Sequence, residues 1–156
     1  MKITGKIISC AKASAICGYR CCDQDPVITA GNARPTDYIM MYPGEYNACD
    51  TRQSHLMPVA AYCGGILARC AKECFDQSQC DPLANYKPLD CMSYPLMPKV
   101  DGGCVTLFKD DRCPLTETDI SESHRETTQK RWQELAAVNP DVLDWLSSLT
   151  MDGYTQ

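Results

Sequence analysis

The number and placement of the cysteines constrain this chain more than any other feature. Twelve cysteines occur among 156 residues, which is near the level at which cysteine usage marks a class of protein. All of them lie between Cys10 and Cys113. Two explanations compete: disulfides formed in an oxidising compartment, or thiolates that bind metal in a reducing one.

The densest combination of cysteine and proline is the stretch from Cys74 to Pro95, which contains Cys80 and Cys91. Proline fixes its backbone φ angle and donates no backbone hydrogen bond. We therefore expect residues 74–98 to form a rigid loop that holds metal ligands, with neither a helix nor a paired central strand. The four prolines of this range are Pro82, Pro88, Pro95 and Pro98.

The compartment follows from what precedes the cysteines. The only apolar run near the start is Ile7-Ile8, whereas a secretory signal needs roughly 7–15 apolar residues. No stretch approaches the roughly 20 apolar residues of a transmembrane helix. We expect a cytoplasmic protein that binds metal and contacts no membrane. A secreted, disulfide-stapled interaction domain is the alternative.

The charge pattern argues against a nucleic-acid partner. The net charge is −5, and no run of five like charges occurs, whereas a nucleic-acid surface needs a clustered basic face. No glycine-rich phosphate-binding loop is present. A protein partner is the remaining expectation.

The predicted fold is a small, irregular α+β domain with a cysteine-rich, metal-organised core and a C-terminal helical hairpin. We expect the core to span residues 1–115 and the hairpin residues 116–156, packed together as one domain. Residues 104–109 are the best strand, and residues 37–42 form a short buried strand or an extended chain. Residues 66–72 are expected to form one or two helical turns.

Two helices are predicted in the hairpin. The first spans residues 119–138 and is mostly polar, with Thr116 and Asp119 as a weak capping box and with His124 exposed to solvent. The second begins at Asn139-Pro140-Asp141, a favourable helix start. Four of its apolar residues recur at helical spacing: Val142, Trp145, Leu146 and Leu149.

Two smaller signals concern residues near possible ligands. Glu45 follows a Pro-Gly turn and is expected to be a first-turn helix acid, with a role as an acceptor behind a metal ligand as the alternative. Gly64-Gly65 lacks a Cβ atom and so allows a ligand to approach the backbone.

Thiolates suit zinc, Cu(I) and iron–sulfur clusters, and four of them satisfy one zinc ion or one cluster. The spacings contain no pair of C-x2-C knuckles and no ferredoxin-like run. Many irregularly spaced thiols with an adjacent pair, Cys21-Cys22, favour an iron–sulfur cluster such as [4Fe–4S] over zinc. Any single cysteine can instead be a small buried hydrophobe.

The cysteine motifs, taken in order, resemble the YkgJ-type cysteine-cluster family of zinc- or iron-chelating proteins. The similar elements are Cys17-Gly18-Tyr19-Arg20-Cys21-Cys22, the segment DYIMMYPGE at 37–45, Cys74-Phe75, Cys80, the segment KPLDC at 87–91, Tyr94-Pro95 and Cys113-Pro114-Leu115. Met92 and Lys87 stand where that family usually has arginine.

The resemblance implies a set of seven metal ligands. These are Cys17, Cys21, Cys22, Cys74, Cys80, Cys91 and Cys113. We expect the bound metal to have a redox or accessory role, with a structural or storage role left open. The family includes an iron–sulfur flagellin lysine methylase, so a protein methylase-like enzyme is a further alternative, although no motif for the methyl donor is present.

Overall fold

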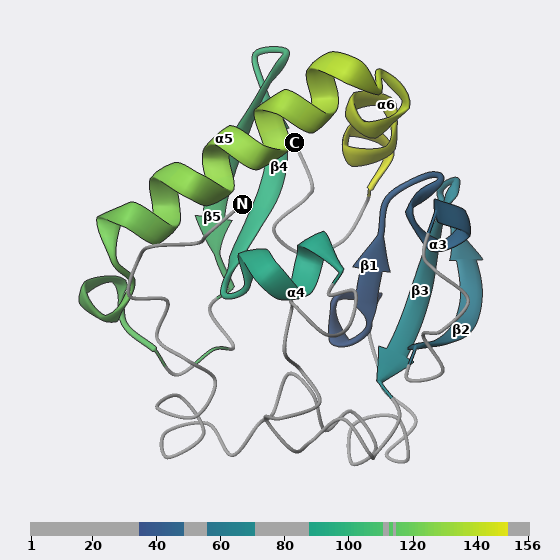
Figure 1. Cartoon of the computed structure of the whole chain (residues 1–156), viewed down its shortest axis with the longest axis horizontal. Helices are drawn as coiled ribbons and strands as arrows, with labels where there is room; N and C mark the ends of the chain where they lie inside the picture. The colour runs from purple at the N-terminus through teal and green to yellow at the C-terminus, as the bar shows by residue number, and fades with distance from the viewer. Residues whose placement is uncertain (1–34, 49–55, 71–87, 111–112, 114, 150–156) are drawn as a thin grey trace.

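The computed structural model describes residues 35–48, 56–70, 88–110, 113 and 115–149 (Figure 1). Two small antiparallel sheets and the C-terminal helical hairpin make up an α+β fold, as predicted. Its strands are β1 (Ile39–Met41), β2 (Leu56–Tyr62), β3 (Gly65–Cys70), β4 (Leu96–Asp101) and β5 (Cys104–Lys109). Its α-helices are α3 (Glu45–Ala48), α4 (Leu89–Ser93), α5 (Glu122–Val138) and α6 (Asp141–Ser148).

The first sheet has the strand order β1-β3-β2, with β3 in the centre. The prediction of helical turns at residues 66–72 is therefore wrong over 66–70, which belong to β3. Ile66 pairs with Met41 on one side and with Ala61 on the other. Periodicity alone cannot distinguish a strand from a helix in so short an apolar run, and the two flanking strands decide the outcome here.

The second sheet is a hairpin of β4 and β5, whose register runs from Leu96 opposite Lys109 to Asp101 opposite Cys104. The predicted strand at 104–109 is confirmed. Gly102 and Gly103 connect the strands with φ angles of +58° and +80°. This is the backbone of a two-residue turn whose twist matches that of the paired strands.

The prediction that residues 74–98 form a rigid loop without a helix is wrong for its described part, residues 88–98, although no central strand occurs there. Residues 89–93 form α4, and Leu96, Met97 and Pro98 pair with β5. The prolines delimit these elements: Pro88 precedes the first residue of α4, where no intrahelical partner is available for an N–H anyway. Pro98 is tolerated because both strands of a two-stranded sheet are edge strands.

The start of the hairpin differs from the prediction by three residues. Residues 117–119 form a 3-10 turn, and α5 begins at Glu122 after Ser121, whose side chain accepts from the His124 N–H at 3.1 Å. Asp119 accepts instead from the backbone N–H of Thr116 at 2.7 Å. The second helix begins at Asp141, close to the expected position, and Pro140 before it already has helical dihedrals.

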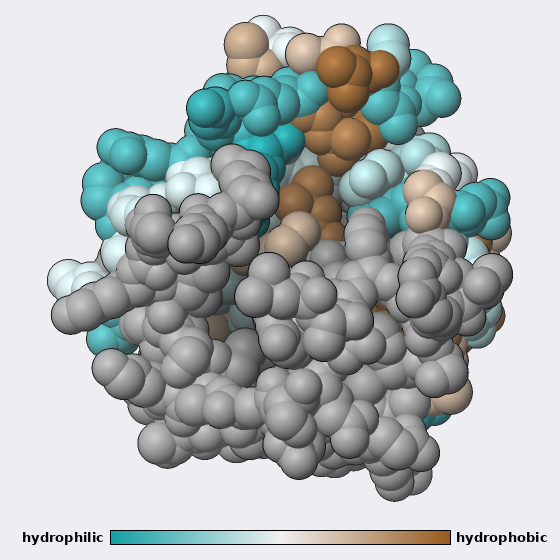
Figure 2. All heavy atoms as spheres, viewed as in Figure 1, coloured by the Kyte–Doolittle hydropathy of each residue, from teal (hydrophilic) through white to brown (hydrophobic). Residues whose placement is uncertain are grey.

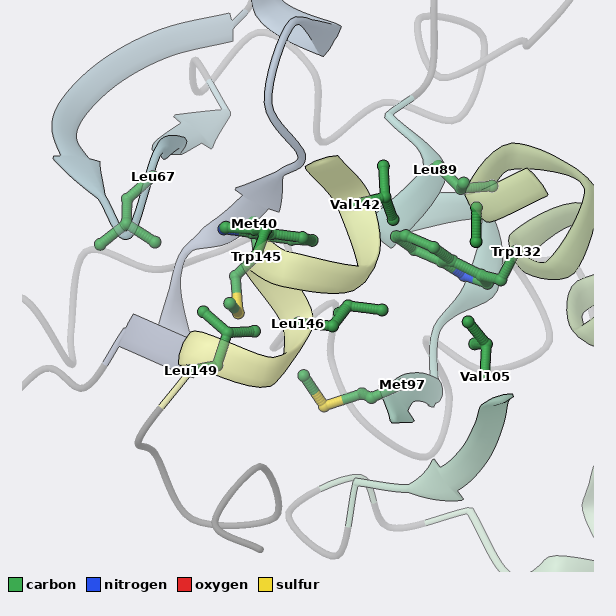
Figure 3. Packing of buried hydrophobic residues seen from close by; sticks show 11 residues of the cluster. Met40, Leu67, Leu89, Met97, Val105, Trp132, Val142, Trp145, Leu146 and Leu149 are labelled. Atoms are coloured by element: carbon green, nitrogen blue, oxygen red, sulfur yellow. The ribbon is translucent and has the colours of Figure 1, made fainter. Parts of the chain in front are cut away.

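One apolar core joins both sheets, α4 and the helical hairpin (Figure 3). Each of these parts contributes, and none of the eleven buried residues is a cysteine. The described core is thus held by apolar packing, whereas the predicted metal-organised part depends mainly on cysteines outside the described residues. The members are Met40, Leu67, Leu89, Met97, Val105, Trp132, Ala136, Val142, Trp145, Leu146 and Leu149.

The inner face of α5 explains why this helix looked polar in the sequence. Its buried residues recur every four positions, and two of them are polar: His124, Thr128, Trp132 and Ala136. The outer face is hydrophilic, as Figure 2 shows. Apolar surface appears where α5 meets α6, and Val138 at the end of α5 is 82% exposed. None of the described helices has the length and apolarity that a membrane span requires.

Gly65 permits a close approach within the protein, and no ligand is needed to explain it. A Cβ atom at this position would stand against the carbonyl oxygen of Met41 and 2.8 Å from Nε1 of Trp145. The glycine therefore allows β1, β3 and α6 to meet. A side chain here would force these elements apart.

Candidate metal centre

Two of the seven predicted ligands lie in the described residues. Cys91 is in α4, and Cys113 follows β5. The other five lie outside the described residues: Cys17, Cys21, Cys22, Cys74 and Cys80. The described part of the candidate centre therefore comprises Cys91, Cys113 and the residues that support them.

Both cysteines belong to segments at the open end of the β4–β5 hairpin, opposite the Gly102-Gly103 turn. The helix α4 leads into β4 through Tyr94 and Pro95, and Cys113 comes four residues after the end of β5. The Asp110 N–H donates to the Pro95 carbonyl at 2.9 Å, which continues the pairing beyond the sheet. Figure 1 shows α4 beside this end of β4.

Cys91 and Cys113 differ in their surroundings. Cys91 is half-buried and packs against a second apolar cluster, formed by Ile39, Met41, Leu56 and Ala68 on the first sheet. Cys113 is only 7% exposed. Its N–H donates to the Asp110 carbonyl at 3.1 Å. The Lys109 ammonium group donates to the carbonyls of Asp110 and Cys113, at 2.9 Å each, and so holds the Cys113 backbone.

The first turn of α4 is attached to the segment that contains β1 and α3. Oε1 of Glu45 accepts from the Leu89 N–H at 3.2 Å, and Oδ2 of Asp90 accepts from the Met40 N–H at 2.8 Å. Pro88, at the N-cap position, has no side chain that could accept a hydrogen bond. Glu45 therefore does for α4 what a capping side chain normally does for its own helix.

The last turn of α4 is attached to α5 through Ser93. The Ser93 hydroxyl donates to the Leu89 carbonyl at 2.6 Å and accepts from Nε1 of Trp132 at 2.8 Å. Nε2 of His124 lies 3.1 Å from the Ser93 carbonyl. A carbonyl oxygen only accepts, so Nε2 is the ring nitrogen that carries a proton.

The expectation that His124 is exposed to solvent is wrong, because its side chain is only 9% exposed. Ser121 caps α5, and this places His124 in the first helical turn, facing α4. The polarity of His124 and of its neighbours in the predicted surface helix favoured exposure. The spacing of four between positions 124, 128 and 132 was the available signal.

Tyr94 connects the two cysteine-bearing segments. Its hydroxyl donates to Oδ2 of Asp110 at 3.2 Å. We call α4, Tyr94, Asp110 and Cys113 the thiol frame. Four of the five buried polar side chains in the described residues bond to this frame or belong to it; they are Glu45, Ser93, Asp110 and His124. Sequence reasoning missed the roles of Ser93, Asp110 and Tyr94.

The donor set in the described residues is incomplete. No group of three His, Cys, Asp or Glu side chains there is arranged to hold a metal ion. Two sulfur donors suit the soft metals of the prediction, but a tetrahedral site needs four.

Two other described cysteines, Cys63 and Cys104, are exposed thiols outside disulfides, and neither belongs to the predicted ligand set. Cys63 occupies the β2–β3 turn with a φ angle of +52°, and Cys104 begins β5. Both therefore lie at hairpin turns, away from the thiol frame in the topology.

Comparison with known proteins finds no family model, no curated protein and no solved structure that matches this chain.

Two of the sequence segments that carry the family resemblance meet in the fold. The segment at 37–45 contacts the segment at 87–91 through the Glu45–Leu89 and Met40–Asp90 hydrogen bonds.

Proposed function

We propose that this chain is a cytoplasmic metal-thiolate protein of the YkgJ type with a redox or accessory role toward a protein partner. Its ligands are drawn from Cys17, Cys21, Cys22, Cys74, Cys80, Cys91 and Cys113. An iron–sulfur cluster is favoured over zinc. The observation that supports the proposal is the concentration of buried polar side chains on the thiol frame.

Buried polar groups are costly unless each is hydrogen-bonded. The apolar core needs none of them for its packing, yet most of those in the described residues hold α4 or the Cys113 turn. Metal ligands need such fixed supports, because a site loosened by a fraction of an ångström loses affinity. A ligand-bearing frame accounts for the placement of these groups.

The α4 helix illustrates the point. It has five residues, and an isolated helix of that length is unstable in water. Glu45, Asp90, His124 and Trp132 make four long-range hydrogen bonds to it or from it. The helix is thus held from both ends in one position, which fixes the backbone that carries Cys91.

The choice of metal rests on the spacing of the thiols. Seven predicted ligands exceed the four that one tetrahedral zinc ion or one iron–sulfur cluster needs, so their number alone does not distinguish the two. Irregular spacing with an adjacent pair and without paired C-x2-C knuckles favours the cluster. Either metal would be held by the same soft sulfur donors.

The deciding experiment is anaerobic purification followed by elemental analysis, acid-labile sulfide determination and a visible spectrum. Iron with matching sulfide and a broad visible absorption would support a cluster. Stoichiometric zinc without colour would support the zinc form. Absence of metal, together with no reactive thiols after denaturation, would refute the proposal and favour a disulfide-stapled domain.

A further inference from the structure

We infer that Glu45 is the positioning residue for Cys91, acting through the first turn of α4. The inference rests on the proposed function, because it assigns Cys91 a ligand role. Glu45 itself touches no predicted ligand in the described contacts. It acts on the helix that carries one.

The geometry makes this carboxylate hard to replace. Glu45 is only 1% exposed, and it comes from α3, 44 positions before the Leu89 N–H to which it bonds. Burying a carboxylate is costly, and packing alone would be served by an apolar side chain. Accepting from the Leu89 N–H is thus one function of this buried carboxylate.

Leu89 is the point where two constraints meet. Its N–H is held by Glu45, and its side chain is buried in the apolar core. Cys91 follows two residues later in the same short helix. Losing the Glu45 bond removes one of the two long-range hydrogen bonds that attach the first turn of α4, so the Cys91 sulfur atom is held less firmly.

Asp90 strengthens the same attachment in the opposite direction, by accepting from the Met40 N–H. The two bonds join α4 to the β1–α3 segment as a reciprocal pair. Asp90 lies next to Cys91 in sequence, so substituting it would change the immediate surroundings of the thiol. Glu45 is distant in sequence and gives the cleaner test.

The test compares Glu45→Ala with Glu45→Gln in the full chain. Alanine removes the acceptor, whereas glutamine keeps an oxygen of the same reach. Zinc affinity is measured by competition with a chromophoric chelator. We expect Glu45→Ala to weaken zinc binding by about 10- to 100-fold, the range for residues that support metal ligands, and Glu45→Gln to retain most of the wild-type affinity.

Val105→Ala is the control for general loss of stability. Val105 is buried in β5 and pairs with Val100 near the hairpin turn, at the end away from α4. The Val105→Ala substitution leaves a cavity and so lowers the melting temperature, while the α4 hydrogen bonds stay in place. A loss of zinc affinity in Val105→Ala equal to that in Glu45→Ala would overturn the inference.

A second measurement separates the inference from the proposed function. The rate of Cys91 alkylation in metal-free protein, resolved by peptide mass spectrometry, reports the position of α4 without any metal. Faster alkylation in Glu45→Ala than in wild type and Val105→Ala supports the positioning role. An unchanged rate overturns it.

If wild-type protein takes up neither iron nor zinc, the proposed function fails. The alkylation result then still decides whether Glu45 positions the Cys91 thiol. If wild type binds metal and Glu45→Ala binds it equally well, the proposed function stands and the role of Glu45 is refuted.

Discussion

Replacing Gly65 by alanine should destabilise the fold at the junction of the first sheet and α6. The added methyl group would meet the carbonyl oxygen of Met41 and would lie 2.8 Å from the Trp145 indole nitrogen. The indole ring is buried in the core, and the carbonyl belongs to a strand paired with β3. Neither neighbour can move aside without disturbing packing or pairing.

Two opposing terms set the magnitude. Overpacking a well-packed interior costs about 1–3 kcal/mol, and the upper part of this range applies because one obstacle is backbone. Gly65 is not among the residues with positive φ, so alanine gains about 0.4–1 kcal/mol by restricting the unfolded chain. The net loss is about 2 kcal/mol, which lowers the melting temperature by about 4–8 °C for a chain of this size.

Thermal and urea unfolding followed by circular dichroism would measure this change. Gly103→Ala is the matched control: it has open space around the added methyl group but a φ angle of +80°, so it reports backbone strain alone. Melting of Gly65→Ala at the wild-type temperature would refute the steric argument.

Three further predictions concern the hairpin and the thiol frame. Trp132→Phe keeps most of the ring but loses the hydrogen bond to Ser93 Oγ at 2.8 Å. The substitution should lower the free energy of unfolding by about 1 kcal/mol. A double-mutant cycle with Ser93→Ala, measured by urea unfolding, should show coupling between the two residues. Hydrogen bonds from the Thr116 backbone and hydroxyl lower the pKa of Asp119. The contribution of Asp119 to stability is therefore present above the ordinary aspartate pKa and is lost as the pH falls through the lowered pKa. An NMR titration of wild type and Thr116→Ala should show a smaller depression of the Asp119 pKa in the variant. Cys91→Ser should reduce metal content and melting temperature together; full metal content with native melting would contradict a ligand role.

Local patterns were sufficient where one segment carried its own signal. The strand at 104–109 has β-favouring residues next to a Gly-Gly turn. The four apolar residues predicted at helical spacing near the C-terminus are all buried: Val142, Trp145, Leu146 and Leu149. The failures occurred where distant segments decide. Residues 66–70 become a strand because β1 and β2 flank them, and Pro88 marks a helix start as readily as a loop.

For the candidate centre, the sequence allowed prediction of the cysteine donors but not of the residues that support them. Cysteine identity and spacing suggested Cys91 and Cys113, but their supports come from far along the chain. The bond from Leu89 to Glu45 spans 44 positions, and that from Trp132 to Ser93 spans 39. No local pattern encodes such pairings. Burial of His124 likewise depends on α4, which the sequence did not predict.

The Trp132–Ser93 bond also provides the protein with an optical reporter. Indole emission responds to the polarity and hydrogen bonding around the ring nitrogen, and only two tryptophans are present. Trp132 bonds directly to the last residue of α4, whereas Trp145 contacts Gly65 at the other sheet. A change in α4 on loading or oxidation of the thiol frame would therefore alter the fluorescence of one tryptophan while the other serves as an internal reference.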